Sequence, residues 1–209
     1  MSYYKYPRTY HLPFSEGYTS DDKILKTDAL FQNMDVVITE KMDGENTTIY
    51  KDFYHARSLD SKHKEYHSWL LGYMKQFQYL IPDGWRICGE YLYAKHSIKY
   101  NNLLSYFLVF SVWNENNDCL SWDDTETFCN ELGLITVPVL YQGKYDSKIV
   151  KKIAKDTVLR GGEGIVVRNK DVFSYNSFSE NIAKYVRKNH VQTDEHWSLC
   201  EIEKNLLKQ

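Results

Sequence analysis

The chain has 209 residues, of which 43% are hydrophobic and 15% aromatic, so it is long enough for one good core and too apolar to remain disordered. Its formal net charge of −2 excludes a basic field over the whole molecule, so any nucleic acid must be bound by a local patch. The absence of a signal-peptide pattern and of any apolar run of membrane-spanning length favours a cytoplasmic location.

The first half of the chain is predicted to be an extended arm followed by strands and one long helix. Pro7 and Pro13 favour extended backbone and predict an N-terminal arm over about residues 1–20. Ser20-Asp21-Asp22 is a helix-cap pattern and predicts a short helix through residue 30. β-Type apolar runs predict strands near 35–41, 46–52 and 54–59, and an apolar stripe at helical spacing predicts a helix over 61–80.

The second half continues with groups of strands separated by helices. A turn at Pro82-Asp83-Gly84 precedes strands predicted at 85–91 and 106–113. Ser121 caps a predicted helix that Gly133 ends. The remaining elements are predicted as a strand at 135–140, a helix from 146 or 147 to about 159, strands at 164–169 and 182–187, and a C-terminal helix at about 193–207.

This order of elements favours an α+β fold. The strands come in adjacent groups with helices inserted between the groups, which is typical of antiparallel or mixed sheets and not of a parallel βαβ fold. Neither an internal repeat nor a low-complexity linker divides the chain, so residues 1–209 are expected to form a single domain, and a monomer is assumed.

Several classes of functional site lack support. The four cysteines, at positions 88, 119, 129 and 200, form no C-x-x-C pair, which argues against zinc and for a reducing compartment. No G-x-G-x-x-G or Walker A pattern occurs. His63 and His67 are spaced as two ligands on one helix face, but no third ligand is evident, so a solvated helix face is the preferred interpretation.

The most informative stretch is Lys41-Met42-Asp43-Gly44. It lies between two predicted strands, where a glycine permits an unusual backbone angle or a close approach to a ligand. A lysine flanked so closely by acids is normally a solvated surface charge. At a strand–turn–strand junction it also suits an amine used as a nucleophile, because covalent catalysis divides one difficult transfer into two easier ones.

Five further chemistry-bearing elements follow Lys41 in order. They are Arg57 in H-A-R-S, Glu90 in G-E-Y at a strand end, Phe110 on an apolar strand, Glu163 in E-G-I-V-V-R, and Lys184 in K-Y-V-R-K. With Lys41, this series resembles the covalent lysyl-nucleotidyltransferases, which comprise ATP-dependent polynucleotide ligases and capping enzymes. The residues around Lys41 and Glu90 are most similar to those of the small ATP-dependent RNA ligases. The resemblance spans roughly residues 35–188 and implies the adenylation-domain fold of these enzymes.

The resemblance also implies a role for each residue. Lys41 would attack the α-phosphorus of ATP and form lysyl-AMP, with its pKa lowered by desolvation and by the positive charges of Arg57, Lys184 and a bound metal. The metal, Mg²⁺ or Mn²⁺, would be placed by Glu163 and Glu90. The nucleotide would further contact Glu40, Asp43, Gly44, Arg57, Glu90 (ribose hydroxyls), Phe110 (adenine), Lys184 (α-phosphate) and Arg187.

Two departures from the family pattern bear on the prediction. Many relatives carry K-x-K in the last motif, whereas Val186 stands two residues after Lys184, so Arg187 or a shifted register would have to replace the second lysine. The short remainder after Lys188 leaves no room for the OB-type domain that related DNA ligases and capping enzymes carry. The substrate would then be held by the C-terminal helix or by the N-terminal arm, where Lys5, Arg8 and His11 alternate with tyrosines, although a packed arm is equally consistent.

Three functions follow in order of preference. The first is an ATP-dependent RNA ligase that joins 5′-phosphate and 3′-hydroxyl ends of free RNA or of a nicked, RNA-containing duplex, in RNA repair. The second is a minimal ATP-dependent DNA ligase. The third is a nucleotide- or RNA-binding module of a larger repair assembly, against which the retention of Lys41, Glu90, Glu163 and Lys184 argues.

Overall fold

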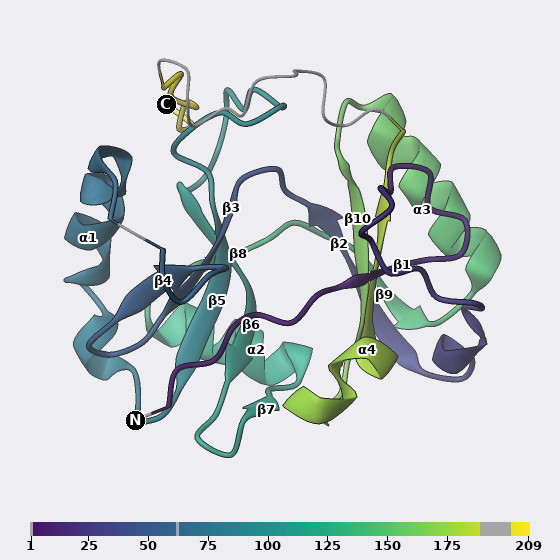
Figure 1. Ribbon diagram of the computed structural model, residues 1–209, viewed down its shortest axis with the longest axis horizontal. Helices are drawn as coiled ribbons and strands as arrows, with labels where there is room; N and C mark the ends of the chain where they lie inside the picture. The colour runs from purple at the N-terminus through teal and green to yellow at the C-terminus, as the bar shows by residue number, and fades with distance from the viewer. Residues whose placement is uncertain (1, 62, 189–201) are drawn as a thin grey trace.

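The chain folds into two β-sheets, with α1 (Ser68–Met74) on the outer side of one and α3 (Ser147–Leu159) on the outer side of the other (Figure 1), and a cavity is lined by residues of both sheets. The structure is a computed structural model that describes residues 2–61, 63–188 and 202–209. Both sheets are mixed, because parallel pairings join the antiparallel ones at β1 and β8. The predicted α+β class is therefore confirmed. None of the helices in these three ranges has the length and apolar character needed to span a bilayer.

The first sheet carries the chain segment that contains Lys41. Its strands lie in the order β1 (Tyr10–His11), β12 (Ile182–Val186), β10 (Gly164–Asn169), β2 (Asp35–Lys41) and β9 (Val139–Lys144). Helix α3 (Ser147–Leu159) packs on its outer face, where Val36, Ile38, Val150 and Ala154 share a buried cluster. Because strand side chains alternate in direction, Val37, Thr39 and Lys41 point to the opposite face, toward the cavity.

The second sheet forms the other wall of the cavity. Its strands lie in the order β11 (Phe173–Ser174), β7 (Asp118–Cys119), β6 (Phe107–Trp113), β5 (Arg86–Tyr91), β3 (Glu45–Ile49) and β4 (Tyr54–Ala56), and β8 (Ile135–Thr136) pairs with β6. The α-helices α1 (Ser68–Met74) and α2 (Trp122–Glu131) pack with this sheet in the larger hydrophobic cluster, and α4 (Phe178–Asn181) precedes β12. The turns include 3₁₀ helices η1 (Ala29–Phe31), η2 (Glu65–His67), η3 (Gln78–Leu80) and η4 (Tyr175–Ser177).

The N-terminal arm crosses the gap between the sheets (Figure 1). Its first residues pack on the second sheet, where the Tyr3 ring lies 4.9 Å from the Tyr50 ring and the Tyr4 N–H donates to the Tyr50 hydroxyl at 2.8 Å. It then reaches the first sheet and pairs as β1 in parallel with β12. The arm thus contacts both sheets, and its aromatic half is packed on the protein.

Two predicted helices are corrected by tertiary contacts. Residues 20–30 form no helix apart from η1, because the backbone pairs with β1 instead: His11 N–H donates to the Lys23 carbonyl and Leu25 N–H to the His11 carbonyl, both at 2.8 Å. The helix predicted over 61–80 is reduced to η2, α1 and η3. After α1, the Phe77 N–H donates to the Met74 carbonyl at 3.1 Å, which is a tighter turn of the 3₁₀ type. The Phe77 ring is buried.

Other predicted elements differ from the structure in smaller ways, first where the chain passes from one sheet to the other. The strand predicted at 135–140 is two strands, β8 in the second sheet and β9 in the first, separated at Val137 and Pro138. Short elements β7, β11, η4 and α4 were not predicted. The C-terminal helix is wrong for residues 202–207, which pair in bridges with Ala94 and Leu103, and its earlier part lies outside the described residues.

Gly164→Ala is expected to destabilise the protein by about 1–3 kcal/mol or more, because an added Cβ would overlap the backbone carbonyl of Tyr185 on β12. Gly72→Ala is the matched control. A Cβ at Gly72 meets no atom within 4 Å, and the residue lies in α1, so this change should stabilise by about 0.5–1 kcal/mol. Urea unfolding of both variants measures the difference, and equal stability of the two would contradict the tight β10–β12 contact.

Candidate active site

A cavity of about 520 Å³ opens between the two sheets, within the size range of small-molecule sites. Both walls contribute residues to it, from β2, β10 and β12 on one side and from β3, β4, β5 and β6 on the other. Most of the predicted site residues line it, namely Glu40, Lys41, Gly44, Arg57, Glu90, Phe110 and Lys184. The sheet topology thus gathers residues that are up to 144 positions apart in the chain (from 40 to 184).

Lys41 ends β2 and is held by Glu163, which precedes β10. The Lys41 Nζ lies 2.8 Å from Oε1 and 2.7 Å from Oε2 of Glu163, whose side chain is only 4% exposed. The antiparallel register that pairs Gly164 with Lys41 brings the two residues together. Burial lowers the pKa of Lys41, but the carboxylates of Glu163 and Glu90 outweigh it and raise the pKa above its ordinary value.

The predicted lowering of the Lys41 pKa is therefore wrong for this structure. The adjacent carboxylates of Glu163, Glu90 and Asp43 outweigh the lowering that burial causes. Lys41 is an ammonium here, and its amine becomes a nucleophile only after a proton leaves and the attraction of Glu163 is weakened. Any cation that binds Glu163 would weaken that attraction.

Glu90 is the second carboxylate beside Lys41. It lies near the end of β5 and accepts a hydrogen bond from the Gly44 N–H at 3.1 Å. Burial and the nearby charges of Glu163 and Asp43 raise the pKa of Glu90 to about 8, although Lys41 and the Gly44 bond oppose this shift. One lysine ammonium thus lies beside two glutamate side chains, so the charge balance of the site favours binding of a further cation.

Glu90→Gln is expected to raise the melting temperature by several degrees at pH 8.5 and to change it little at pH 5. The folded state retains the Glu90 proton to about pH 8, whereas the unfolded chain releases it near pH 4.5, so the wild type loses stability as pH rises through that window. Glutamine cannot ionise and retains an acceptor for Gly44. Melting of both proteins at the two pH values is the measurement, with the exposed Glu131→Gln as control, and a pH-independent difference would contradict the raised pKa.

Gly44 allows the turn after Lys41 to approach the second sheet. A Cβ at this position would lie 2.6 Å from the Tyr91 carbonyl oxygen and 2.8 Å from the Leu92 side chain. Only glycine therefore permits this close approach, which places Lys41 beside Glu90 on β5. The predicted importance of the glycine thus has a packing reason.

Lys184 and Arg57 supply positive charge to the cavity, and Phe110 supplies an apolar face. Val166 pairs with both Thr39 and Lys184, so the Lys184 side chain points to the same face of the sheet as Lys41. Burial, and repulsion by Lys41, lower the pKa of Lys184. Phe110 is half-buried on β6, and its ring contacts that of Tyr6 edge-on at 5.0 Å.

Asp43 and Arg187 do not line the cavity, whereas Glu40 lines it but directs its carboxylate toward α3. The Asp43 carboxylate accepts from Ser97 N–H at 2.8 Å and from Ile98 N–H at 2.7 Å, so it anchors a loop. The Glu40 carboxylate is on the α3 side, where a Cβ on Gly162 would lie 3.3 Å from Oε1. Arg187 follows the end of β12 and does not line the cavity, and Val186 occupies the face that a K-x-K pattern would give to the second lysine.

Several lining residues were not predicted. Tyr6, Pro7 and Thr9 of the arm line the cavity, as does His96. The proximity of the arm carries no local sequence signal, because it depends on the pairing of β1 with β12. The alternation of basic and aromatic residues in the arm was the one available hint.

The histidine pair at 63 and 67 has a packing role. His67 is buried, and its Nε2 lies 2.8 Å from Glu45 Oε1, so the prediction of a solvated face is wrong for this residue. His63 Nδ1 contacts the Tyr54 hydroxyl at 2.5 Å. Within the described ranges, no group of three or more His, Cys, Asp or Glu side chains is arranged to hold a metal ion without other ligands.

Comparisons with known proteins concern the family and the fold. A model of the RNA ligase family matches residues 34–186. Similar structures include an archaeal ATP-dependent RNA ligase (TM-score 0.58, 16% identity, 88% of this chain and 48% of that one) and a putative ATP-dependent DNA ligase from Aquifex aeolicus (0.59, 21%, 88% and 50%). A Naegleria gruberi RNA ligase variant with ATP and Mn is also similar (0.56, 14%, 87% and 60%).

The chain spans about half the length of the archaeal and Aquifex proteins that it resembles. At these low sequence identities, the similarity to the solved structures shows a shared fold and nothing more. A comparison of the sequence with curated proteins finds no match.

Proposed function

Because the chain belongs to the RNA ligase family, we propose that it is an ATP-dependent RNA ligase that joins 5′-phosphate and 3′-hydroxyl ends in RNA repair. The observation that carries the proposal is the Lys41 ammonium, held by Glu163 in a cavity that also contains Glu90, Phe110 and Lys184. The names of the similar archaeal and Naegleria proteins support an ATP-dependent reaction on RNA.

The proposed reaction has three steps. In the first, a bond forms between Lys41 Nζ and the α-phosphorus of ATP, the bond from that phosphorus to the bridging oxygen breaks, and pyrophosphate leaves. In the second, an oxygen of the RNA 5′-phosphate attacks the same phosphorus, and the lysine nitrogen departs. In the third, the 3′-hydroxyl attacks the 5′-phosphorus, loses its proton and releases AMP, which leaves a phosphodiester bond.

The residues around Lys41 have separate proposed roles. Lys184 would bind the α-phosphate, because its ammonium points into the cavity on the same face as Lys41. Phe110 would stack on the adenine with its half-buried ring. Glu90 would accept hydrogen bonds from the ribose hydroxyls, and Arg57 is exposed at the rim, where it can contact phosphates.

The carboxylates of Glu163 and Glu90 fit a divalent metal ion. They are two oxygen donors beside one lysine, and burial together with the nearby charges of Glu163 and Asp43 raises the pKa of Glu90. Mg²⁺ commonly binds one or two protein carboxylates together with water and substrate phosphates, so two are sufficient. When bound, the metal, Mg²⁺ or Mn²⁺, would neutralise charge that develops on the phosphates.

A DNA ligase is the second candidate, favoured by the likeness to the Aquifex protein. The test is sealing of a nicked duplex that carries a 5′-phosphate, with either RNA or DNA on the 3′-hydroxyl side of the nick. The 2′-hydroxyl is the group that distinguishes the two substrates. We expect the RNA strand to be sealed and a 5′-hydroxyl control to remain open. Sealing of the DNA strand alone would support the second candidate. If the protein seals neither strand and forms no covalent bond to the nucleotide, a binding module would be the better interpretation.

A further inference from the structure

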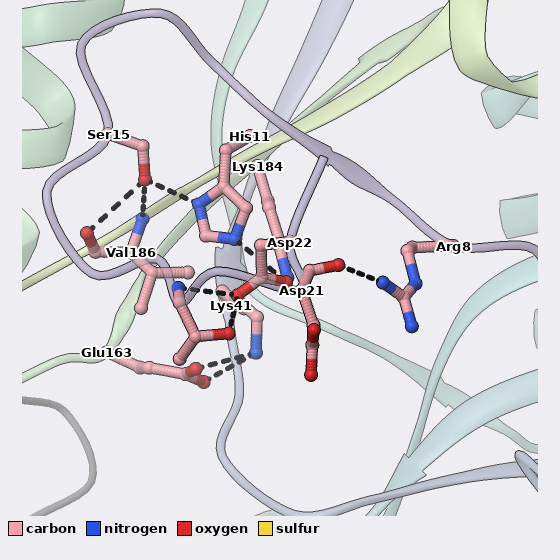
Figure 2. Close-up of polar contacts among 10 residues, drawn as sticks. Arg8, His11, Ser15, Asp21, Asp22, Lys41, Glu163, Lys184 and Val186 are labelled. Carbon is pink, nitrogen blue, oxygen red and sulfur yellow. Dashed lines mark hydrogen bonds and ion pairs between the residues drawn. The ribbon is translucent and has the colours of Figure 1, made fainter. Parts of the chain in front are cut away.

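The Lys184 side chain contacts a carboxylate that belongs to none of the motifs around the cavity. Asp22 Oδ1 lies 3.7 Å from Lys184 Nζ and 3.5 Å from His11 Nε2. Figure 2 shows Asp22 between these two side chains, in the same view as the Lys41–Glu163 pair. Each lysine on this face of the sheet therefore has its own carboxylate partner, Glu163 for Lys41 and Asp22 for Lys184.

Asp22 is fixed by its own segment of the chain. Its Oδ2 accepts from the Thr19 N–H at 3.0 Å and from the Thr19 hydroxyl at 3.1 Å, which leaves Oδ1 for His11 and Lys184. The backbone that follows pairs with β1 through His11 and Lys23. The carboxylate is thus held at a defined place beside β12, and its position does not depend on Lys184.

His11 and Ser15 attach the arm to β12 beside Asp22. The Ser15 Oγ lies 2.8 Å from His11 Nδ1 and accepts from the Val186 N–H at 3.0 Å, which ties the arm to the end of β12. The Ser15 hydroxyl also donates to the Val186 carbonyl at 3.4 Å, and the His11 Nε2 faces Asp22. Burial and the Lys184 charge lower the pKa of His11 to about 4, so the imidazole is neutral. Lys184 is therefore attracted by an Asp22 charge that His11 does not neutralise.

We propose that Asp22 is a positioning residue for the reaction, which holds Lys184 as a charged ammonium directed at the nucleotide phosphate. This inference rests on the proposed function, because it assigns Lys184 to the phosphate. Lys184 is surrounded by Lys41, Arg57, Glu163, Asp22 and the neutral His11. The two nearby cations disfavour its charge, and Asp22 and Glu163 favour it. Without Asp22, Lys184 would lose its proton at a lower pH and would no longer be fixed.

The test is transfer of label from α-labelled ATP to the full chain in a single turnover, measured from pH 6 to pH 10. Asp22→Asn is expected to slow the transfer about 10- to 100-fold, the range lost with one charged contact, and to move the alkaline limb of the profile to lower pH. Asp22→Glu keeps the charge and should restore most of the rate. Asp21→Asn, a neighbouring and exposed change of the same kind, should match the wild type.

A second measurement separates positioning from folding. ATP binding is followed by calorimetry in a Lys41→Ala background, where no covalent transfer occurs, and Asp22→Asn should weaken it about tenfold while the melting temperature stays above the assay temperature. An unchanged rate and pH profile, or a slower rate with an unchanged profile, would overturn the proposal. Tighter ATP binding would also overturn it, since Asp22 would then compete with phosphate. Failure of the wild type to label refutes the proposed function instead.

Discussion

Lys41→Ala is expected to abolish covalent transfer of AMP from ATP to the protein. The proposed nucleophile, the Lys41 Nζ, lies against Glu163 at the cavity, and the alanine side chain offers no atom that can form the phosphorus–nitrogen bond. Incubation of the purified chain with α-labelled ATP and Mg²⁺, followed by denaturing electrophoresis, measures the transfer. We expect a labelled band for the wild type and none for the variant.

Two controls sharpen this experiment. Lys41→Arg retains a cation that can pair with Glu163, so it should fold normally and still give no band, which separates the nucleophile from the ion pair. Lys152→Ala removes an exposed lysine on α3 and should label like the wild type. A band that persists in Lys41→Ala would assign the chemistry to another residue. A wild type that binds ATP without labelling would favour a binding module.

Glu163→Gln is expected to slow the same transfer by about 10²–10³-fold, which corresponds to the several kcal/mol that a correctly placed metal ion contributes to such a transition state. The substitution has two opposing effects. It removes a negative charge that raises the pKa of Lys41, which by itself would make the amine easier to deprotonate. It also removes a ligand for the metal, and we expect this loss to dominate.

The dependence of the rate on metal concentration and pH distinguishes the two effects. If metal binding is impaired, the variant should require more Mg²⁺ or Mn²⁺ for half-maximal transfer. If only the Lys41 pKa changes, the acid limb of the pH profile should move to lower pH with no change in metal requirement. Glu131→Gln, on an exposed helix end, is the matched control. A near-normal rate for Glu163→Gln would remove the metal assignment.

The strands around the site could be predicted because their patterns are local. Asp35–Lys41 and Phe107–Trp113 are β-type runs that occur where predicted, within one residue. The helix that begins after Ser121 also had a local signal, since the serine hydroxyl accepts from the Asp124 N–H at 3.1 Å. Patterns of this kind depend on neighbours in sequence, which the sequence displays directly.

The failed predictions involve segments whose partners are distant in sequence. Residues 20–30 have a helix cap, yet their backbone pairs with His11 on β1. The helix predicted over 61–80 ends at Met74, and the ring of Phe77 beyond it is buried. In both cases hydrogen bonds and apolar burial supplied by tertiary structure exceed the few tenths of a kcal/mol by which local propensity favours a helix.

The sequence by itself determined the chemical types at the candidate site and their order, because a lysine, two carboxylates and a second lysine were identifiable in their motifs. Only the tertiary structure decided which of them share the cavity. It aligns Lys41 and Lys184 on one sheet face, directs Asp43 to a loop, excludes Arg187 and brings Asp22 beside Lys184. The physical reason is that strand pairing joins β1, β2, β10 and β12 across the whole chain, and the twofold period of a strand then fixes where each side chain points.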